Sequence, residues 1–206
     1  MQIQNNKEEV PFEHYMTRFG VMHPEEASAR CGAAFDAEKN EFSVRLLGTG
    51  YRIAWPEYAI VSEHEDAFAL KSLPCQTFLL RFLLEGKRAA AYTQFKTFRE
   101  MPWGEMYITP YTGRCLTRAA FTFGMKLEKF RAACEKMGAK PIGHGDAGYE
   151  FDFMDGYAMQ IMVWAGDDEF PPSSQILYSE NFADGFAAED RVVAGDILIS
   201  AIKAQM

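Results

Sequence analysis

The sequence lacks the cysteine patterns that bind zinc, hold an iron–sulfur cluster or form a redox dithiol. Its four cysteines are scattered over 206 residues, and no two of them form a CxxC pair. Cys75 and Cys134 fall on the apolar stripes of predicted helices, where a thiol behaves as a small hydrophobic side chain. The N-terminal residues MQIQNNKEEV show no cationic-then-apolar signal pattern. The cysteines are therefore predicted to be buried free thiols, and the protein is predicted to be soluble and cytoplasmic.

Long apolar runs and clusters of basic residues are also missing. No run approaches the roughly 20 apolar residues that span a bilayer, so no membrane partner is expected. The formal net charge is −8 and the pI is about 5.1. Phosphate binding needs several Lys and Arg residues on one face, and the nearest approach to such a cluster is Lys87-Arg88. Nucleic acid is therefore not an expected partner.

The familiar catalytic motifs are absent too. The chain has no GxSxG elbow, no HExxH pair, no phosphate loop that ends in GK[ST], and no EF-hand loop. Whether the protein is an enzyme stays open at this level. The residues also name no cofactor, no substrate and no oligomeric state.

What the sequence does contain is the composition of a globular domain. Hydrophobic residues make up 48% of the chain and aromatic residues 14%. A chain of this length can bury roughly 70% of its unfolded surface. No repeat or low-complexity linker divides it. A single domain over residues 1–206 is predicted, with the polar residues 1–10 poorly ordered.

Two regions predict antiparallel hairpins. Apolar and polar residues alternate over residues 42–46 and 51–55, on either side of a glycine-rich turn. They alternate again over residues 149–153, which the preferred two-residue turn Asp155-Gly156 separates from residues 157–164. This last run is nearly continuous in apolar residues, as is typical of a strand that is buried on both faces.

Apolar residues at helical spacing predict the helices that cover these strands. The main helices are expected at residues 74–85, 126–137 and 187–203. Shorter helices are expected at residues 11–19, 24–31 and 114–123, whereas residues 57–71 show no clear pattern. The sequence thus predicts the α+β class, with an antiparallel sheet of two hairpin regions and helices packed against it.

Two unusual loops flank the second hairpin and carry the candidate binding residues. The segment GHGDAG, residues 143–148, leads into its first strand, and the segment WAGDDEFPP, residues 164–172, follows its second strand. Antiparallel pairing brings these segments to one end, so we expect an acidic site there. The candidate ligand-binding residues are His144, Asp146, Asp167, Asp168 and Glu169, with Trp164 and Trp103 as walls. The candidate metal ligands are Asp146, Asp167 and Glu169.

Each loop also has a simpler interpretation. Gly-Asp-Asp is typical of a turn whose side-chain oxygens accept hydrogen bonds from nearby backbone amides, and the prolines that follow stiffen the chain. His144 can act as a general base or a metal ligand, but it can equally be a solvated loop residue beside a turn that Asp146 caps. The sequence leaves both interpretations open.

Several segments together resemble a known family. In chain order they are FREMPWGEMY, GDAGYEF, WAGDDEFP, ILYS and AEDRVVAG, and the resemblance extends from about Ala27 over most of the chain. The family that these segments resemble is an anaerobe family called domain of unknown function 3786. The WxGDxEFP signature is its most specific part, and it corresponds here to Trp164, Gly166, Asp167, Glu169, Phe170 and Pro171.

The resemblance implies a source among strictly anaerobic bacteria or archaea, but it implies no particular activity. Some members carry an additional cysteine-rich segment that suggests an iron–sulfur cluster. This chain has no such segment, because its four cysteines are scattered. A cluster-linked role would therefore need a partner protein that supplies the cluster.

Three functions follow as alternatives. The leading hypothesis is a cytoplasmic accessory module that binds a ligand or cofactor between the GHGDAG and WAGDDEFP loops. The alternative is a metal-assisted hydrolase in which the same carboxylates hold the metal and His144 serves as acid or base. The third is a structural or protein-interaction domain. The partner under these hypotheses is a small molecule or another protein.

Overall fold

The computed structural model describes residues 9–65 and 67–206 of the chain. The predicted poor order of residues 1–10 falls largely on residues 1–8, which lie outside the described residues. Glu9 and Val10 already belong to the first helix, α1 (Glu9–Val21). These two positions are therefore helical.

The described strands form one nine-stranded sheet in which all the pairings are antiparallel. Its main order is β4-β3-β2-β7-β8-β9-β5, while β1 pairs with β2 and β6 pairs with β7. The strands are β1 (Ala34–Asp36), β2 (Glu41–Leu46), β3 (Thr49–Ala54), β4 (Ile60–Ser62), β5 (Phe95–Thr97), β6 (Lys140–Pro141), β7 (Ala147–Met154), β8 (Tyr157–Trp164) and β9 (Ser173–Ser179). Together with the helices, this sheet confirms the α+β class.

The three main predicted helices are confirmed as α3, α6 and α8, with ends that differ from the prediction by no more than one residue. Beyond α1, the α-helices are α2 (Pro24–Cys31), α3 (Leu73–Glu85), α4 (Gly104–Tyr111), α5 (Arg118–Phe123), α6 (Leu127–Lys136), α7 (Phe182–Gly185) and α8 (Ala188–Ala204). Short 3-10 turns lie at η1 (Phe68–Lys71) and η2 (Phe98–Glu100). No helix within residues 9–65 and 67–206 is both long enough and apolar enough to cross a bilayer.

The helix expected at residues 114–123 is longer than predicted. A π-helical segment, η3 (Thr112–Thr117), joins α4 to α5, so that one helix runs from Gly104 to Phe123. Pro110 lies inside it and lacks the N–H that an α-helix uses, which is why the sequence predicted only the second half. At 1.5 Å per residue this helix is about 30 Å long.

Both predicted hairpins are confirmed. In the first, Leu47 and Gly48 form the turn with positive φ angles of 48° and 79°, and Leu46 pairs with Thr49. This turn lies one residue earlier than Gly48-Thr49-Gly50, the turn that the sequence predicted. In the second hairpin, Asp155-Gly156 forms the predicted turn between Met154 and Tyr157. The hairpins meet where β2 and β7 pair, so they belong to one sheet.

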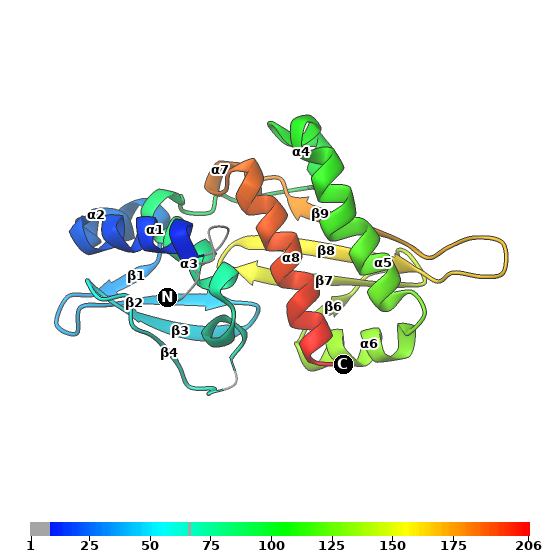
Figure 1. Cartoon of the computed structure of the whole chain (residues 1–206), viewed down its shortest axis with the longest axis horizontal. Helices are drawn as coiled ribbons and strands as arrows, with labels where there is room; N and C mark the ends of the chain where they lie inside the picture. Colours follow the sequence, from blue (N-terminus) through cyan, green and yellow to red (C-terminus); the bar gives the residue numbers. More distant parts are fainter. Residues whose placement is uncertain (1–8, 66) are drawn as a thin grey trace, which may run out of the picture.

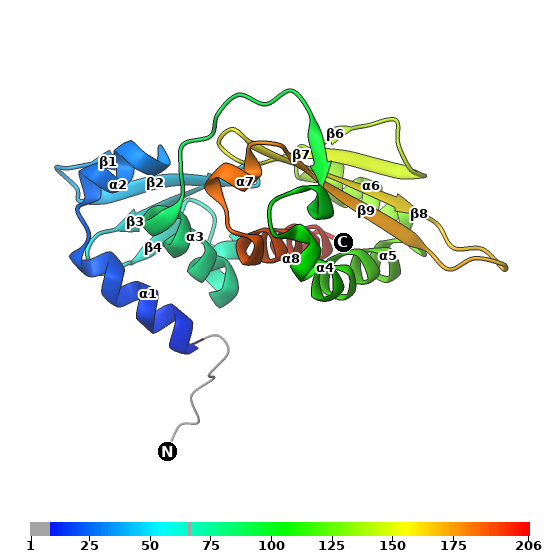
Figure 2. The same ribbon diagram turned by 90° about the horizontal axis from the view of Figure 1, so that it is seen from above.

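Helices cover one face of the second hairpin region. Figure 1 shows α4, α5 and α8 in front of β7, β8 and β9, and Figure 2 shows the same three helices on one side of these strands. Helix α3 packs against α1, α2 and α8, and its Phe78 contacts Phe153 of β7 and stacks on Phe186, with ring centroids 5.7 and 5.1 Å apart. A single domain stays a prediction, which this shared core supports.

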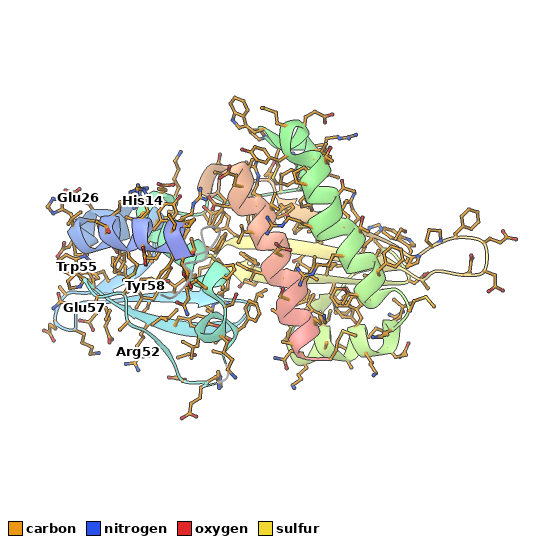
Figure 3. All side chains as sticks on the ribbon, in the orientation of Figure 1. His14, Glu26, Arg52, Trp55, Glu57 and Tyr58 are labelled. Carbon is orange, nitrogen blue, oxygen red and sulfur yellow. The ribbon has the colours of Figure 1, made fainter. Side chains whose placement is uncertain are left out.

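The end of the first hairpin and the start of the segment that the sequence left unassigned are tied to the helices through Trp55 and Tyr58 (Figure 3). The indole Nε1–H of Trp55 donates to the carbonyl oxygen of Phe19 at 3.0 Å. The hydroxyl of Tyr58 donates to the carbonyl oxygen of Gln76 at 2.7 Å. These bonds hold the end of the first hairpin against α1 and α3.

All four cysteines are buried and unpaired, as the sequence predicted. Burial raises the pKa values of the Cys75 and Cys134 thiols well above the ordinary value of a cysteine thiol. Since the thiolate is the reactive form, we expect dithionitrobenzoate to label none of the four thiols promptly in the folded protein and all of them after unfolding in guanidinium. Absorbance measured with time checks this, and prompt labelling of folded protein would contradict it.

Candidate functional site

The two candidate loops lie at the same end of the second hairpin. Ala147, the first residue of β7, is opposite Val163 near the end of β8. The backbone N–H of Asp146 donates to the carbonyl oxygen of Val163 at 3.0 Å. Its carboxylate Oδ2 accepts a hydrogen bond from the backbone N–H of Ala165 at 2.8 Å. Antiparallel pairing therefore brings the two loops to one end, and Asp146 is the direct link between them.

The glycines of GHGDAG make a compact bend beside β8. Gly145 has a φ of 75°, and a Cβ atom there would lie 3.0 Å from the carbonyl oxygen of Val163. A Cβ atom at Gly148 would overlap the carbonyl oxygen of His144. Both positions therefore need glycine for backbone reasons. His144 itself is exposed at this bend, as the solvated-loop interpretation predicts.

Asp167 stabilises the turn of its own loop. Its Oδ1 accepts hydrogen bonds from the backbone N–H groups of Phe170 at 2.7 Å and Glu169 at 2.9 Å. These bonds lower the pKa of the Asp167 carboxyl. Its own N–H donates to the carbonyl oxygen of Phe170 at 2.9 Å. The turn interpretation thus describes Asp167, while Asp168 and Glu169 point their charges into solvent.

The three candidate metal ligands do not come together. Within residues 9–65 and 67–206, no group of three or more His, Cys, Asp or Glu side chains is placed so that it could hold a metal ion. Asp146 is engaged with Ala165, and Asp167 with its own turn. Backbone amides therefore occupy both carboxylates, since Asp167 bonds within its own loop and Asp146 bonds across to the other loop.

Trp103 is not a wall of this site. It precedes α4, at the start of the helix whose far end, Phe123, is about 30 Å away. Trp164 ends β8 and is partly exposed where the loops meet. Only one of the two candidate tryptophans therefore belongs to this end of the molecule. The sequence placed Trp103 next to a turn and predicted only residues 114–123 of the helix that separates it from Trp164.

The loop between β8 and β9 projects from the body of the protein, and its side chains stand out in Figure 3 (see also Figures 1 and 2). The two ends of the loop pack directly against each other at its base, because a Cβ atom at Gly166 would lie 2.7 Å from Cδ of Pro172. Phe170, beyond that base, is 66% exposed. The sequence pointed to the acids of this loop as candidate binding residues, whereas Phe170 was not among them.

Two further exposed apolar side chains lie at the same end. Phe121 and Met125 are four positions apart around the end of α5, and both are largely exposed. Gly124, between them, lies directly against Pro172 and the backbone of Trp164. We call Phe121, Met125, Trp164 and Phe170 the apolar end. Of these, Trp164 alone was a candidate binding residue from the sequence, and Phe170 appeared there only in the family signature.

A second feature that the sequence missed lies at the start of α8. Asp190 is 6% exposed, and its Oδ1 lies 3.0 Å from Nε of Arg81. Arg191, the next residue, is 1% exposed. Acids in the first turn of a helix are usually explained by the helix dipole, and nothing in the local sequence indicates that Asp190 is buried.

The fold and this end of the molecule define an α+β protein whose sheet carries a projecting acidic loop next to exposed apolar side chains. Residues 23–201 match the family described as Domain of unknown function (DUF3786), and the chain belongs to that family. The family resemblance is thus confirmed, while the anaerobic source and the WxGDxEFP signature stay predictions. Neither a curated protein nor a solved structure matches the chain.

Proposed function

We propose that the protein is an accessory module that binds a partner protein through the loop of residues 164–172 and the apolar end beside it. The observation that carries this proposal is the exposed ring of Phe170 on a projecting loop whose base is closed. Exposed apolar side chains that gather at one place, next to charged residues, are typical of an interaction site.

Hydrogen bonds to two carboxylates support the backbone of the loop. Asp167 bonds to the N–H groups of Glu169 and Phe170, and Asp146 bonds to Ala165 at the base. A loop that is already ordered loses less conformational entropy on binding, which favours affinity. This arrangement gives the carboxylates of Asp146 and Asp167 a structural purpose that needs no metal ion.

The chemistry of the loop points to a basic partner surface. Asp168 and Glu169 are exposed, and among the described residues neither forms an ion pair. The net charge of the chain is −8, which adds to their field. The complementary surface is an apolar pocket that accepts the ring of Phe170 and is surrounded by Lys and Arg side chains.

The other two functions receive less support. A ligand pocket between the loops needs convergent side chains, whereas Asp167 faces its own backbone and Trp103 lies elsewhere. A metal-assisted hydrolase needs a group of metal ligands, which the described part of the chain does not assemble. The cytoplasmic location stays part of the proposal, and the four buried unpaired thiols support a reducing compartment.

A random peptide library, selected on the immobilised full chain, tests the proposal. We expect the enriched peptides to combine an aromatic or aliphatic residue with Lys or Arg. Phe170→Ser is expected to weaken their binding at least about 10-fold, because buried aromatic residues dominate such interfaces. Reversing the charge of Asp168 and Glu169 to Lys is expected to slow association, with a weaker dependence on salt. Fluorescence anisotropy and stopped-flow measurements give both quantities.

Val21→Ser is the matched control, since Val21 is also an exposed apolar residue but ends α1. It is expected to leave peptide binding unchanged. Both serine variants should unfold at the same urea concentration as the unmodified chain, because neither side chain is buried. Enriched peptides that bind the Phe170→Ser variant as tightly as the unmodified chain would contradict the proposal.

A further inference from the structure

A pocket lies at the turn of the β7–β8 hairpin, which is the end opposite to the loop of residues 164–172. It has a volume of about 200 Å³, and residues of α2, β2, α3 and the turn Asp155-Gly156 line it. We call it the turn pocket. Its apolar lining residues include Val44, Phe82, Ala89 and Met154. Since an apolar cavity of roughly 150 Å³ can bind benzene, the turn pocket is large enough for one aromatic ring.

Basic side chains surround the turn pocket. Arg45 and Arg88 line it. The backbone N–H of Arg88 donates to the carbonyl oxygen of Arg30 at 2.8 Å. Burial raises the pKa of the Cys31 thiol in the pocket wall, and the charges of Arg30 and Arg88 act against it, so both guanidinium groups lie nearby. Lys87 precedes Arg88 in the chain. Four cations are thus gathered at one place on a chain whose net charge is −8.

Most of this positive charge is not neutralised. Within residues 9–65 and 67–206, no ion pair includes Arg30, Lys87 or Arg88. Arg30 donates to backbone carbonyl oxygens at the end of α3 instead. Arg45 has two carboxylate partners, Asp152 and Asp155. Four cations against two carboxylates leave two positive charges in excess around the pocket.

The loop of residues 164–172 has the complementary character. It carries the exposed ring of Phe170 next to the exposed carboxylates of Asp168 and Glu169. The ring matches the apolar lining of the turn pocket, and the two carboxylates match its two excess positive charges. An apolar contact that is surrounded by opposite charges favours association and fixes its orientation.

The loop and the turn pocket of one chain cannot meet. They lie at opposite ends of β8, whose 8 residues extend over about 25 Å. Figure 1 shows the loop between β8 and β9 on the far right, whereas α2 and β2 lie on the left. A contact between this loop and this pocket therefore needs two copies of the chain.

We propose that the partner of the loop is a second copy of this chain, and that Phe170 of one copy occupies the turn pocket of the next. Asp168 and Glu169 then lie against Arg88 and its basic neighbours. Because the two surfaces differ, each pair of copies keeps one free loop and one free pocket, and association continues head to tail. This inference rests on the proposed function, since it names the partner of the same loop.

Sedimentation velocity of the full chain between about 10 μM and about 1 mM tests the proposal. We expect the average mass to rise with concentration and to give a Kd of about 100 μM, because one aromatic anchor and a few charge pairs form a small interface. Phe170→Ser and Arg88→Glu should each weaken the association at least about 10-fold. The first variant removes the ring, and the second places a negative charge where Asp168 and Glu169 arrive.

Arg99→Glu is the matched control. Arg99 is an exposed arginine that is not among the pocket residues, and its replacement changes the net charge by the same amount as Arg88→Glu does. It is expected to leave the association unchanged. The side chains of Phe170 and Arg88 are exposed as well, so all three variants should fold normally.

A mixture of the two defective variants tests the head-to-tail arrangement directly. The Arg88→Glu chain keeps its loop, and the Phe170→Ser chain keeps its turn pocket. An equimolar mixture should therefore form one-to-one dimers with the Kd of the unmodified chain and no larger species. A mixture that stays monomeric while the unmodified chain associates would overturn the proposal.

Two further outcomes would refute the second copy as the partner. One is association that both the Phe170→Ser and the Arg88→Glu variants retain in full. The other is an unmodified chain that stays monomeric at about 1 mM, ten times the expected Kd. If library peptides still bind such a monomer through Phe170, the proposed function stands and this inference fails. If the peptides do not depend on Phe170 either, both fail.

Discussion

Replacing Arg191 with methionine is expected to lower the free energy of unfolding by about 3 kcal/mol, because it removes two hydrogen bonds from a buried guanidinium, one of them to the buried carbonyl oxygen of Phe186. The Arg191 guanidinium donates to the carbonyl oxygens of Phe186 and Pro102 and lies 5.8 Å from the ring centroid of Phe98. Methionine fills much of the same space but donates no hydrogen bond. Urea unfolding at neutral pH, followed by circular dichroism, measures the difference.

The matched control is Arg99→Met. Arg99 forms an exposed ion pair with Glu105, with Nε and Oε2 3.0 Å apart. Exposed pairs of this kind contribute less than about 1 kcal/mol. A similar loss of stability in both variants would show that the hydrogen bonds of Arg191 contribute no more to stability than an exposed ion pair does.

Asp190 is expected to make the protein less stable as the pH rises through about 6. Burial is the main cause that raises the pKa of this carboxyl to about 6, and Glu85 and Glu189 add to it, while Arg81 and the N–H of Ala187 act against it. Because this pKa lies above the ordinary value of 3.8, the contribution is fully favourable below pH 3.8 and is lost by about pH 6. The loss amounts to about 3 kcal/mol.

Comparing the unmodified chain with Asp190→Asn isolates this contribution. The stability of the variant relative to the unmodified chain is expected to rise by about 3 kcal/mol between pH 4 and pH 7, since asparagine does not ionise. Urea titrations at several pH values give this difference curve. A flat curve would mean that Asp190 ionises as readily in the folded protein as in the unfolded chain.

Asp36→Asn supplies a control of opposite sign. Backbone and side-chain bonds from Lys39 lower the pKa of Asp36 below its ordinary value of 3.8. Its contribution to stability is therefore present above pH 3.8 and lost as the pH falls. The difference curve of Asp36→Asn should accordingly run in the other direction from that of Asp190→Asn. Two curves of the same slope would point to a general effect of pH on the fold.

The elements that were predicted well are those whose residues carry a local pattern. The apolar stripe of α3 repeats at helical spacing and ends at Gly86, so both of its ends followed from the sequence. The turn Asp155-Gly156 fixed the centre of the second hairpin. The strand β9 was missed because its apolar residues, Ile176, Leu177 and Tyr178, are consecutive and follow two serines and a glutamine, so the segment shows no alternation of apolar and polar residues. Its pairing with β8 makes it a strand.

The candidate site was predicted in part. Antiparallel pairing is a property of the hairpin, so it correctly brought Asp146 next to the segment that follows β8. The hydrogen-bond partner of each carboxylate could not be predicted in the same way, because nearby backbone amides compete with partners that are distant in the sequence. Asp167 bonds to its own loop, and a 30 Å helix keeps Trp103 away from Trp164.

The sequence by itself determined the α+β class, the main helices and the end at which the two loops meet, because helical and strand periodicity are set by near neighbours along the chain. Only the tertiary structure decided that Phe170 stays exposed, that Asp190 is buried, and that Arg81 lies beside it. Burial and charge pairing depend on contacts between residues that are far apart in the chain. A local pattern carries no information about such contacts.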